Sequence, residues 1–210
     1  KILKLNPSVI VVEDDLITSK NFLDFMNQAL KFYESQKKIL SISGYTLNLK
    51  SLPINEDVYF GYRASSWGWA TWSEHWNKID WDVIDFHQFC NDKNAIKKFK
   101  RGGSDMPRML KKQMTGKIDS WAIRFCYHQF KNDLITVFPT VSKLKSIGYS
   151  KSATHTFGTK RFFTKIDTEL KRHFRFKNFN KIDNEIIKEF RSFFSIKNRI
   201  KDRLNRFLKF

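Results

Sequence analysis

Residues 8–16, SVIVVEDDL, join an unbroken apolar run to three consecutive carboxylates. A continuous apolar run of this length predicts a strand buried on both faces, as in a parallel sheet covered by helices. In open α/β sheets, ligands bind beyond the carboxyl ends of such strands. The sequence therefore predicts a ligand near Glu13, Asp14 and Asp15.

Three neighbouring carboxylates repel one another, and hard oxygen ligands are those that Mg²⁺ and Mn²⁺ prefer. A divalent cation would relieve the repulsion among Glu13, Asp14 and Asp15. The alternative is a solvated acidic turn that also caps a following helix, because carboxylates are favourable near helix N-termini. The position at the end of a buried strand favours the cation site.

The residues after these acids predict a strand–helix–strand unit. Apolar residues recur at three- and four-residue intervals over residues 22–33, which predicts an amphipathic helix with Thr18 or Ser19 as its N-cap. Residues 39–43 (ILSIS) predict a strand that a right-handed crossover would make parallel to the first. Further strands are expected at residues 58–64 and 134–139.

A buried parallel strand this close to residue 1 needs neighbours that the downstream sequence scarcely supplies. We therefore expect the chain as given to begin within a fold whose upstream half is missing. Cys90 and Cys126 show no CxxC or Cys/His spacing, which argues against a structural zinc site and a disulfide framework. No apolar run approaches the roughly 20 residues that a membrane-spanning helix needs.

Five of the six tryptophans lie between Trp67 and Trp81. Trp67 and Trp69 flank Gly68, which permits a tight backbone and close approach by a partner. The rings are either part of the core, where aromatic side chains contribute much of the buried area, or a flat apolar wall against which a sugar ring or a nucleobase stacks. Both can hold if some rings are buried and one is exposed.

Residues 119–128 predict a helix with Asp119 at its N-cap. A capping carboxylate is usually structural, bonded to free backbone amides. It also stays ionised at neutral pH, which is the state that a general base needs. His155 lies in a polar loop further on, where a single histidine is more often a surface residue than a ligand.

In this order, the acidic strand end, residues 67–72, the Asp119-Ser120-Trp121 sequence, and residues 138–155 resemble the nucleotide-sugar glycosyltransferases of GT-A fold. The similarity is to the branch around N-acetylglucosaminyltransferase I and its bacterial relatives, and it covers about residues 8–157. It implies a Rossmann-like α/β fold with a mostly parallel sheet and flanking helices. The family's N-terminal nucleotide-binding strands have no counterpart in the sequence, so the chain would be an incomplete and inactive fragment unless they are supplied.

The resemblance also implies the roles of individual residues. Asp15 would ligate Mn²⁺ or Mg²⁺ held by the donor diphosphate, while Glu13 and Asp14 would contact ribose or the donor sugar. Asp119 would be the general base of a single, inverting displacement that transfers a hexosyl or N-acetylhexosaminyl group to a glycan or lipid-linked acceptor. The remaining donor-binding residues would be Trp67, Gly68, Trp69, Gly148 and His155.

The net charge of +18 is concentrated near the end of the chain, since residues 160–210 hold more than half of the excess. We divide the sequence into a catalytic portion, residues 1–159, and a basic, largely helical tail, residues 160–210. From Ile186 onward, phenylalanines and aliphatic residues alternate with lysines and arginines at helical spacing. Such a helix either lies on an anionic membrane surface through residues 184–210 or packs on the domain with its basic face solvated.

The resemblance and the tail together predict a cytoplasmic enzyme of polysaccharide synthesis, peripheral on the inner face of a bacterial membrane. The alternative function is a basic nucleic-acid-binding domain with an aromatic stacking surface. The sequence shows no RNP-type aromatic motif, zinc-finger spacing or helix-turn-helix pattern. Nucleic-acid binding also leaves the acids at the strand end unexplained, so we expect no nucleic-acid partner.

Overall fold

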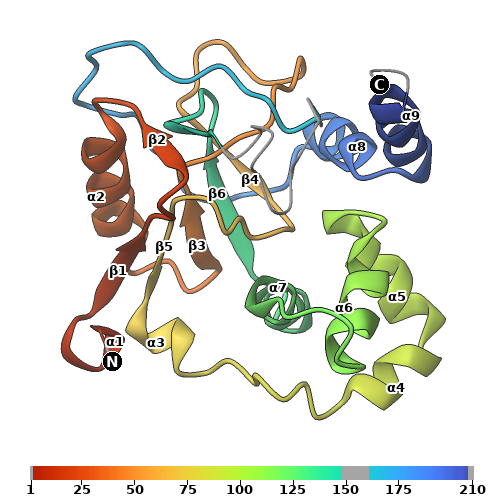
Figure 1. Ribbon diagram of the computed structural model, residues 1–210. Coiled ribbons are helices and arrows are strands. Elements are labelled where there is room, and N and C mark those ends of the chain that lie inside the picture. The colour runs from red at the N-terminus through yellow and green to blue at the C-terminus, as the bar shows by residue number, and fades with distance from the viewer. Residues whose placement is uncertain (1, 148–160, 208–210) are drawn as a thin grey trace.

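The computed structural model describes residues 2–147 and 161–207 as a mixed α/β fold built on a five-stranded sheet (Figure 1). The strand order is β1-β5-β3-β6-β4. These strands are Ser8–Val11 (β1), Trp69–Trp72 (β5), Ile39–Ser43 (β3), Ile135–Pro139 (β6) and Val58–Gly61 (β4). A two-stranded antiparallel sheet is formed by Leu16–Thr18 (β2) and Leu144–Ser146 (β7).

The five-stranded sheet is mostly antiparallel, which corrects the mostly parallel sheet expected from the sequence. Among the described strands only β3 and β6 pair in parallel. β5 runs antiparallel to both β1 and β3, and β4 runs antiparallel to β6. The expected crossover does join β1 to β3, but these strands do not pair because β5 lies between them. They still point in the same direction, so their carboxyl ends meet at one edge of the sheet.

Helices cover both faces of this sheet (Figure 1). On one face, the helix α2, Phe22–Tyr33, buries the apolar stripe that its periodicity predicts. On the other face, α7, Trp121–Lys131, buries Ile123, Phe125 and Cys126. The shorter elements are Ile2–Leu5 (α1), Ser73–Trp76 (α3), Phe86–Asn91 (α4), Lys93–Phe99 (α5), Lys100–Gly102 (η1) and Met106–Met114 (α6).

The strand β1 lies at the edge of the sheet, whereas its sequence predicts a central position. Its one strand partner in the described part of the chain is β5, and all four of its residues are half-buried. Both faces are nevertheless packed, because Ile10 contacts the core on the α2 side and Val11 contacts the core on the α7 side. An edge strand covered on both faces thus has the same apolar sequence as a central one.

The N-terminus of α2 also differs from the prediction. Thr18 belongs to β2, and the cap position is Asn21, whose side chain makes no capping hydrogen bond. Asn21 instead accepts a hydrogen bond from Ser19 Oγ (2.7 Å) and donates one to Asp167 (3.0 Å). Neither Thr18 nor Ser19 is therefore the N-cap of α2. The side chain of Asn21, which holds the cap position, is bonded to Ser19 and to the distant Asp167 instead of to the helix amides.

Residues 161–182, here called the strap, run without helix along α2 (Figure 1). Gln28 and Tyr33 on α2 donate side-chain hydrogen bonds to strap carbonyls at distances of 2.7 and 2.9 Å. The Phe174 ring meets Phe25 edge-on, with 5.2 Å between centroids. Because these contacts repeat along α2, the strap forms the outer cover of this side of the core.

A buried ion pair fixes the start of the strap. The side chains of Lys143 and Asp167 are 6% and 5% exposed, and Asp167 also accepts hydrogen bonds from Asn21 and from the Glu169 N–H. Burial alone would raise the pKa of Asp167, but these hydrogen bonds outweigh it and hold the pKa below its usual value. The carboxylate therefore remains charged at neutral pH.

The strap leads into two helices, α8 (Asn184–Phe193) and α9 (Ile196–Phe207). The single helix expected from Ile186 onward is therefore interrupted at Phe194 and Ser195. Asp183 begins α8 as its N-cap, accepting hydrogen bonds from two backbone amides. α8 buries its apolar side in the same core cluster as α2, so the C-terminal part of the chain contributes to the main core.

Candidate functional site

The candidate site lies where the carboxyl ends of β1 and β3 meet the start of β5. Val11 and Ser43 are both register partners of Trp69, from opposite sides. The turn with the three acids follows β1 at this edge, and the loop that begins at Gly44 follows β3. The strand-end rule therefore applies to this edge even though the sheet is mostly antiparallel.

Gly68 brings the segment before β5 close to its neighbours. Its φ of +49° is in the left-handed region, and a Cβ there would lie 2.0 Å from Leu144 Cδ2. Its carbonyl accepts a hydrogen bond from the Gly44 N–H at 2.6 Å. The tight backbone that the sequence predicted at this glycine is confirmed, and it positions Trp67 and Trp69 on either side of a fixed turn.

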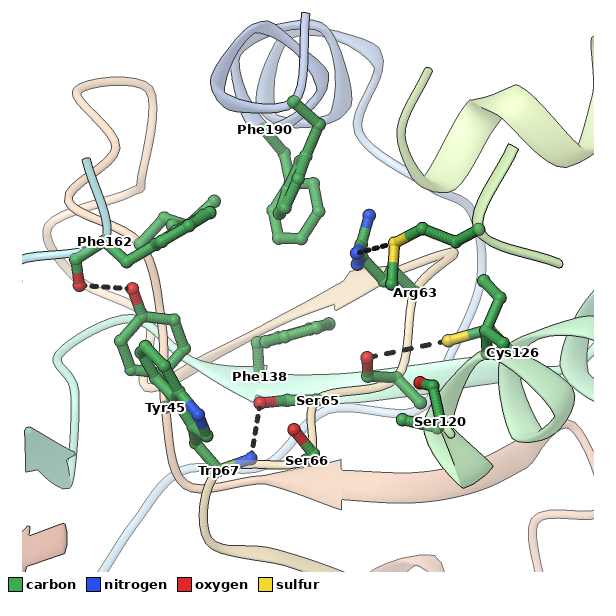
Figure 2. A pocket seen from close by; sticks show the side chains of 16 residues that line it. Tyr45, Arg63, Ser65, Ser66, Trp67, Ser120, Cys126, Phe138, Phe162 and Phe190 are labelled. Carbon is green, nitrogen blue, oxygen red and sulfur yellow. Dashed lines mark hydrogen bonds between the residues drawn. The ribbon is translucent and has the colours of Figure 1, made fainter. Parts of the chain in front are cut away.

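On one side of this segment is a cavity of about 250 Å³, here called the central cavity (Figure 2). Trp67 borders it, with Tyr45 and Phe162 packed edge-on against the indole at 4.8 and 6.2 Å. Ser120, which immediately precedes α7, also borders the cavity, and α8 contributes Phe190. Six of its sixteen lining residues are aromatic, and the hydroxyl groups of Ser65, Ser66 and Ser120 are among its polar groups.

Charge near the central cavity is provided by Arg63, whose guanidinium donates to both carboxylate oxygens of Asp105 at 3.0–3.2 Å. Burial would lower the pKa of Arg63, but Asp105 outweighs this effect and the pKa is raised. Burial also raises the pKa of the Cys126 thiol, which donates to the Ala64 carbonyl at 3.7 Å. Cys126 is therefore a protonated core residue and a poor nucleophile.

On the other side is an open hollow of about 770 Å³, here called the tryptophan groove. Its walls are almost entirely apolar. Among the described residues, Glu13 is the one acidic residue that borders it. The rings of Trp69 and Trp121 lie 4.8 Å apart, and the buried Trp69 indole N–H has no acceptor in the described part of the chain. The groove is lined by Ile2, Leu3, Val9, Val11, Glu13, Trp69, Trp76, Trp81 and Trp121.

The three acids form a turn between β1 and β2. Glu13 and Asp14 are exposed, and Asp15 is half-buried. Partial desolvation, followed by repulsion from Asp15 and Asp14, raises the pKa of Glu13. Asp15 accepts a hydrogen bond from Ser146 Oγ at 3.2 Å. The turn does not cap a helix, because β2 follows it directly.

Asp119 is exposed and immediately precedes α7, but it is not the N-cap that the sequence predicted. The cap position is Ser120, whose extended backbone (φ −143°) starts the helix one residue later and whose N–H donates to Gln113. The Asp119 carboxylate has no hydrogen-bond partner among residues 2–147 and 161–207. It therefore has no capping role at α7.

The structure brings part of the predicted set together. Glu13 and Trp121 border the tryptophan groove, and Trp67 and Ser120 border the central cavity, so the start of α7 contacts both hollows. Asp119 directly precedes this point. The predicted donor-binding residues Gly148 and His155 lie outside the described residues.

No group of three or more His, Cys, Asp or Glu side chains is arranged to hold a metal ion in the part of the chain that the structure describes. Sequence reasoning also missed Tyr45 and Arg63 as lining residues of the central cavity. Tyr45 follows the strand predicted at residues 39–43 by two residues, which was the available signal for it. Arg63 lies within the strand predicted at residues 58–64, and the observed strand β4 ends earlier, at Gly61. Because both residues are far from α7 in the sequence, the sequence alone did not indicate that they line one cavity with residues of α7.

The comparisons with known proteins provide no family assignment: no protein-family model matches the chain, and no curated protein matches it. No helix in the described ranges is both long and apolar enough to cross a bilayer. The geometry of the two hollows therefore carries the functional argument.

Proposed function

We propose that this chain is part of a nucleotide-sugar glycosyltransferase of GT-A fold that transfers a sugar to a glycan or lipid-linked acceptor with inversion. The proposal depends on one observation: Glu13, at the carboxyl end of β1, and Trp121, two residues after Asp119, border the same groove. The acids expected to face the donor and the carboxylate expected to act as the base are thereby associated with one surface hollow.

The tryptophan groove has the chemistry of a sugar site. Indole rings present flat apolar faces to the C–H groups of a pyranose, and Glu13 adds a hydrogen-bond acceptor for sugar hydroxyls. Packing of the tryptophans on one another gives no specific support to the alternative of a nucleic-acid stacking surface.

In this proposal Asp119 is the general base. Its exposed carboxylate accepts the proton of an acceptor hydroxyl as that oxygen attacks the anomeric carbon, while the bond to the departing diphosphate breaks on the opposite face. A correctly placed base of this kind typically contributes 10²- to 10⁴-fold to the rate. No residue in the described ranges forms a capping bond with the Asp119 carboxylate, which supports this role.

A divalent ion fits these residues only in part. Asp15 offers one carboxylate. Partial burial is the main cause of the raised pKa of Glu13, and repulsion from Asp15 and Asp14, which a cation would relieve, adds to it. Since no three-ligand cluster exists in the described ranges, the donor diphosphate would have to complete the coordination shell. Mn²⁺ or Mg²⁺ bound there would stabilise negative charge on the leaving group.

The outer edge of β1 is the position where the nucleotide-binding strands of the GT-A resemblance would pair. Among the described strands β1 pairs only with β5, and β1 runs in the same direction as β3. Strands added beyond β1 would extend the sheet and bring a nucleoside site next to the three acids. This arrangement makes the edge position of β1 compatible with the proposed fold.

The test compares Asp119→Asn with Asp82→Asn, a control at another exposed aspartate, in the natural full-length protein. Transfer from a panel of nucleotide sugars with Mn²⁺ should fall at least 10²-fold in Asp119→Asn and stay within twofold in the control. Donor affinity, followed by calorimetry, should be unchanged in both. Asp15→Asn should instead weaken metal-dependent donor binding at least tenfold.

Equal loss of transfer and donor binding in Asp119→Asn would contradict the role of Asp119 as a base. Failure of every nucleotide sugar to bind with Mn²⁺, together with tight binding of an oligonucleotide that weakens steeply with salt, would overturn the assignment as a transferase.

A further inference from the structure

The helix α9 carries an apolar stripe that no described residue covers. Ile196, Ile200 and Leu204 are 62%, 52% and 56% exposed, and they follow one another at intervals of four residues. Residues spaced in this way lie along one side of a helix, one turn apart. Three large aliphatic side chains in a row on one helix face form a continuous apolar strip, unlike the scattered exposed residues that are normal on a protein surface.

Basic residues accompany this stripe. Five basic residues and one acidic residue occur within the twelve residues of α9. At about 100° per residue, Lys197 and Lys201 fall on one flank of the stripe and Arg199 on the other. Asn198 and Asp202 fall on the opposite face of the helix. Long basic side chains beside an apolar strip match a bilayer surface, where aliphatic groups enter the acyl boundary and the charges reach the phosphates.

The preceding helix cannot play this role. The apolar side of α8 is already buried, since Ile186, Ile187 and Phe190 are between 4% and 6% exposed, and Ile186 and Phe190 belong to the main core cluster. Figure 1 shows α9 beside α8 at the periphery of the fold. The structure therefore narrows the membrane hypothesis for residues 184–210 from the whole segment to α9.

We propose that α9 docks on an anionic lipid bilayer, lying parallel to the surface with Ile196, Ile200 and Leu204 inserted and Lys197, Arg199 and Lys201 paired with lipid phosphates. Charge complementarity selects this occupant, because a helix this basic would be repelled by a second copy of itself. This inference is independent of the proposed transferase activity, since none of the residues involved borders the central cavity or the tryptophan groove.

The test measures co-sedimentation of the full chain with vesicles of phosphatidylcholine and phosphatidylglycerol. Ile200→Asn/Leu204→Asn should lower binding at least tenfold, because the inserted apolar groups are lost. Ile54→Asn/Ile84→Asn is the matched control, since these isoleucines are 99% and 82% exposed elsewhere on the surface. The control should bind as the natural chain does.

A second pair of variants separates specific docking from the general effect of a net charge of +18. Lys197→Gln/Lys201→Gln should lower binding to anionic vesicles about thirtyfold, which corresponds to about 1 kcal/mol for each basic residue near the surface. Lys111→Gln/Lys117→Gln removes the same charge from exposed positions around α6 and should have an effect of less than threefold. Vesicles of phosphatidylcholine alone should bind weakly.

Three outcomes would overturn the proposal. The first is an equal loss in the α9 variants and their controls, which would indicate adsorption by overall charge. The second is an absence of binding to anionic vesicles at low salt. The third is a selective loss of binding to a DNA duplex in the α9 variants with vesicle binding unchanged, which would assign α9 to nucleic acid. The substituted side chains are exposed, so we expect every variant to fold. An unfolding midpoint equal to that of the natural chain verifies this for each variant.

Discussion

The helices α8 and α9 are consecutive, similar in length and similar in pattern, yet their apolar sides have opposite environments. Both place an aliphatic or aromatic residue every three or four positions and fill the intervening positions with polar and basic residues. In α8 the apolar side is almost completely buried, whereas in α9 more than half of each aliphatic side chain is exposed. The periodicity therefore predicts the helix and its apolar face, but not what covers that face.

The difference comes from partners that are far away in the sequence. Phe190 on α8 packs against Phe138 on β6, with 5.7 Å between ring centroids. On the same helix, the Glu189 carboxylate accepts hydrogen bonds from the Lys50 and Ser51 backbone amides and from Ser51 Oγ, at 2.7–2.9 Å. None of the described α9 side chains belongs to either hydrophobic core cluster. The following three changes test this contrast.

The largest effect is expected for Phe190→Ala in α8. Phe190 is 5% exposed and contacts Phe138 and Phe194, so truncation leaves a void in the main core. Such substitutions cost about 3–5 kcal/mol in the free energy of unfolding. Urea unfolding followed by circular dichroism measures this loss. A cost below about 1 kcal/mol would show that α8 is not docked on the sheet.

An intermediate effect is expected for Glu189→Gln. Burial alone would raise the pKa of Glu189, but its hydrogen bonds with Lys50 and Ser51 outweigh this and lower it. Hydrogen bonds to a charged group contribute about 1.5–3 kcal/mol, and the substitution should remove stability in this range at pH 7. Glu185→Gln, at an exposed carboxylate of the same helix, should cost less than about 0.5 kcal/mol.

The stability lost in Glu189→Gln should depend on pH in a defined direction. A carboxylate with a lowered folded-state pKa stabilises the protein above its unfolded-state pKa, and the benefit is lost as the pH falls through the folded-state value. The difference in unfolding free energy between the natural chain and Glu189→Gln should therefore shrink as the pH falls below 4.5, the ordinary pKa of a glutamate side chain. A difference that is constant from pH 7 to pH 3 would contradict this account.

The smallest effect is expected for Ile200→Ala in α9. Its side chain is half exposed, so truncation removes little buried area and the unfolding free energy should change by less than about 0.5 kcal/mol. The same urea experiment measures it. A loss above about 1 kcal/mol would mean that another part of the protein covers the stripe, which would also remove the basis for bilayer docking.

Much of the local structure could be predicted from the sequence, because local periodicity reports which face is buried. The apolar stripe of α2 is an example, and the strands at residues 39–43 and 135–139 are others. The sheet could not be predicted in the same way. The four residues of β5 are rich in tryptophan and are too short to show alternation, so their insertion between β1 and β3 left no local signal.

The candidate site shows the same division. Glu13 and Asp119 could be selected from their positions at element ends, and the structure associates Glu13 with the start of α7 through the tryptophan groove. The cap at Asp119 was misplaced by one residue, because the backbone conformation of Ser120 decides where the helix begins. Arg63 could not be selected, since its role near the central cavity depends on Asp105, 42 positions away.

The buried pair of Lys143 and Asp167 has a consequence for any attempt to dissect this protein. A shortened chain that ends before the strap would leave Lys143, which is 4% exposed in the intact fold, without its counter-ion and would uncover the Phe25 ring. Removing one partner of a buried ion pair typically costs about 3–5 kcal/mol. Expression of the sheet and α2 without residues 161–182 should therefore yield an aggregation-prone product, whereas proteins shortened only within α9 should remain well behaved.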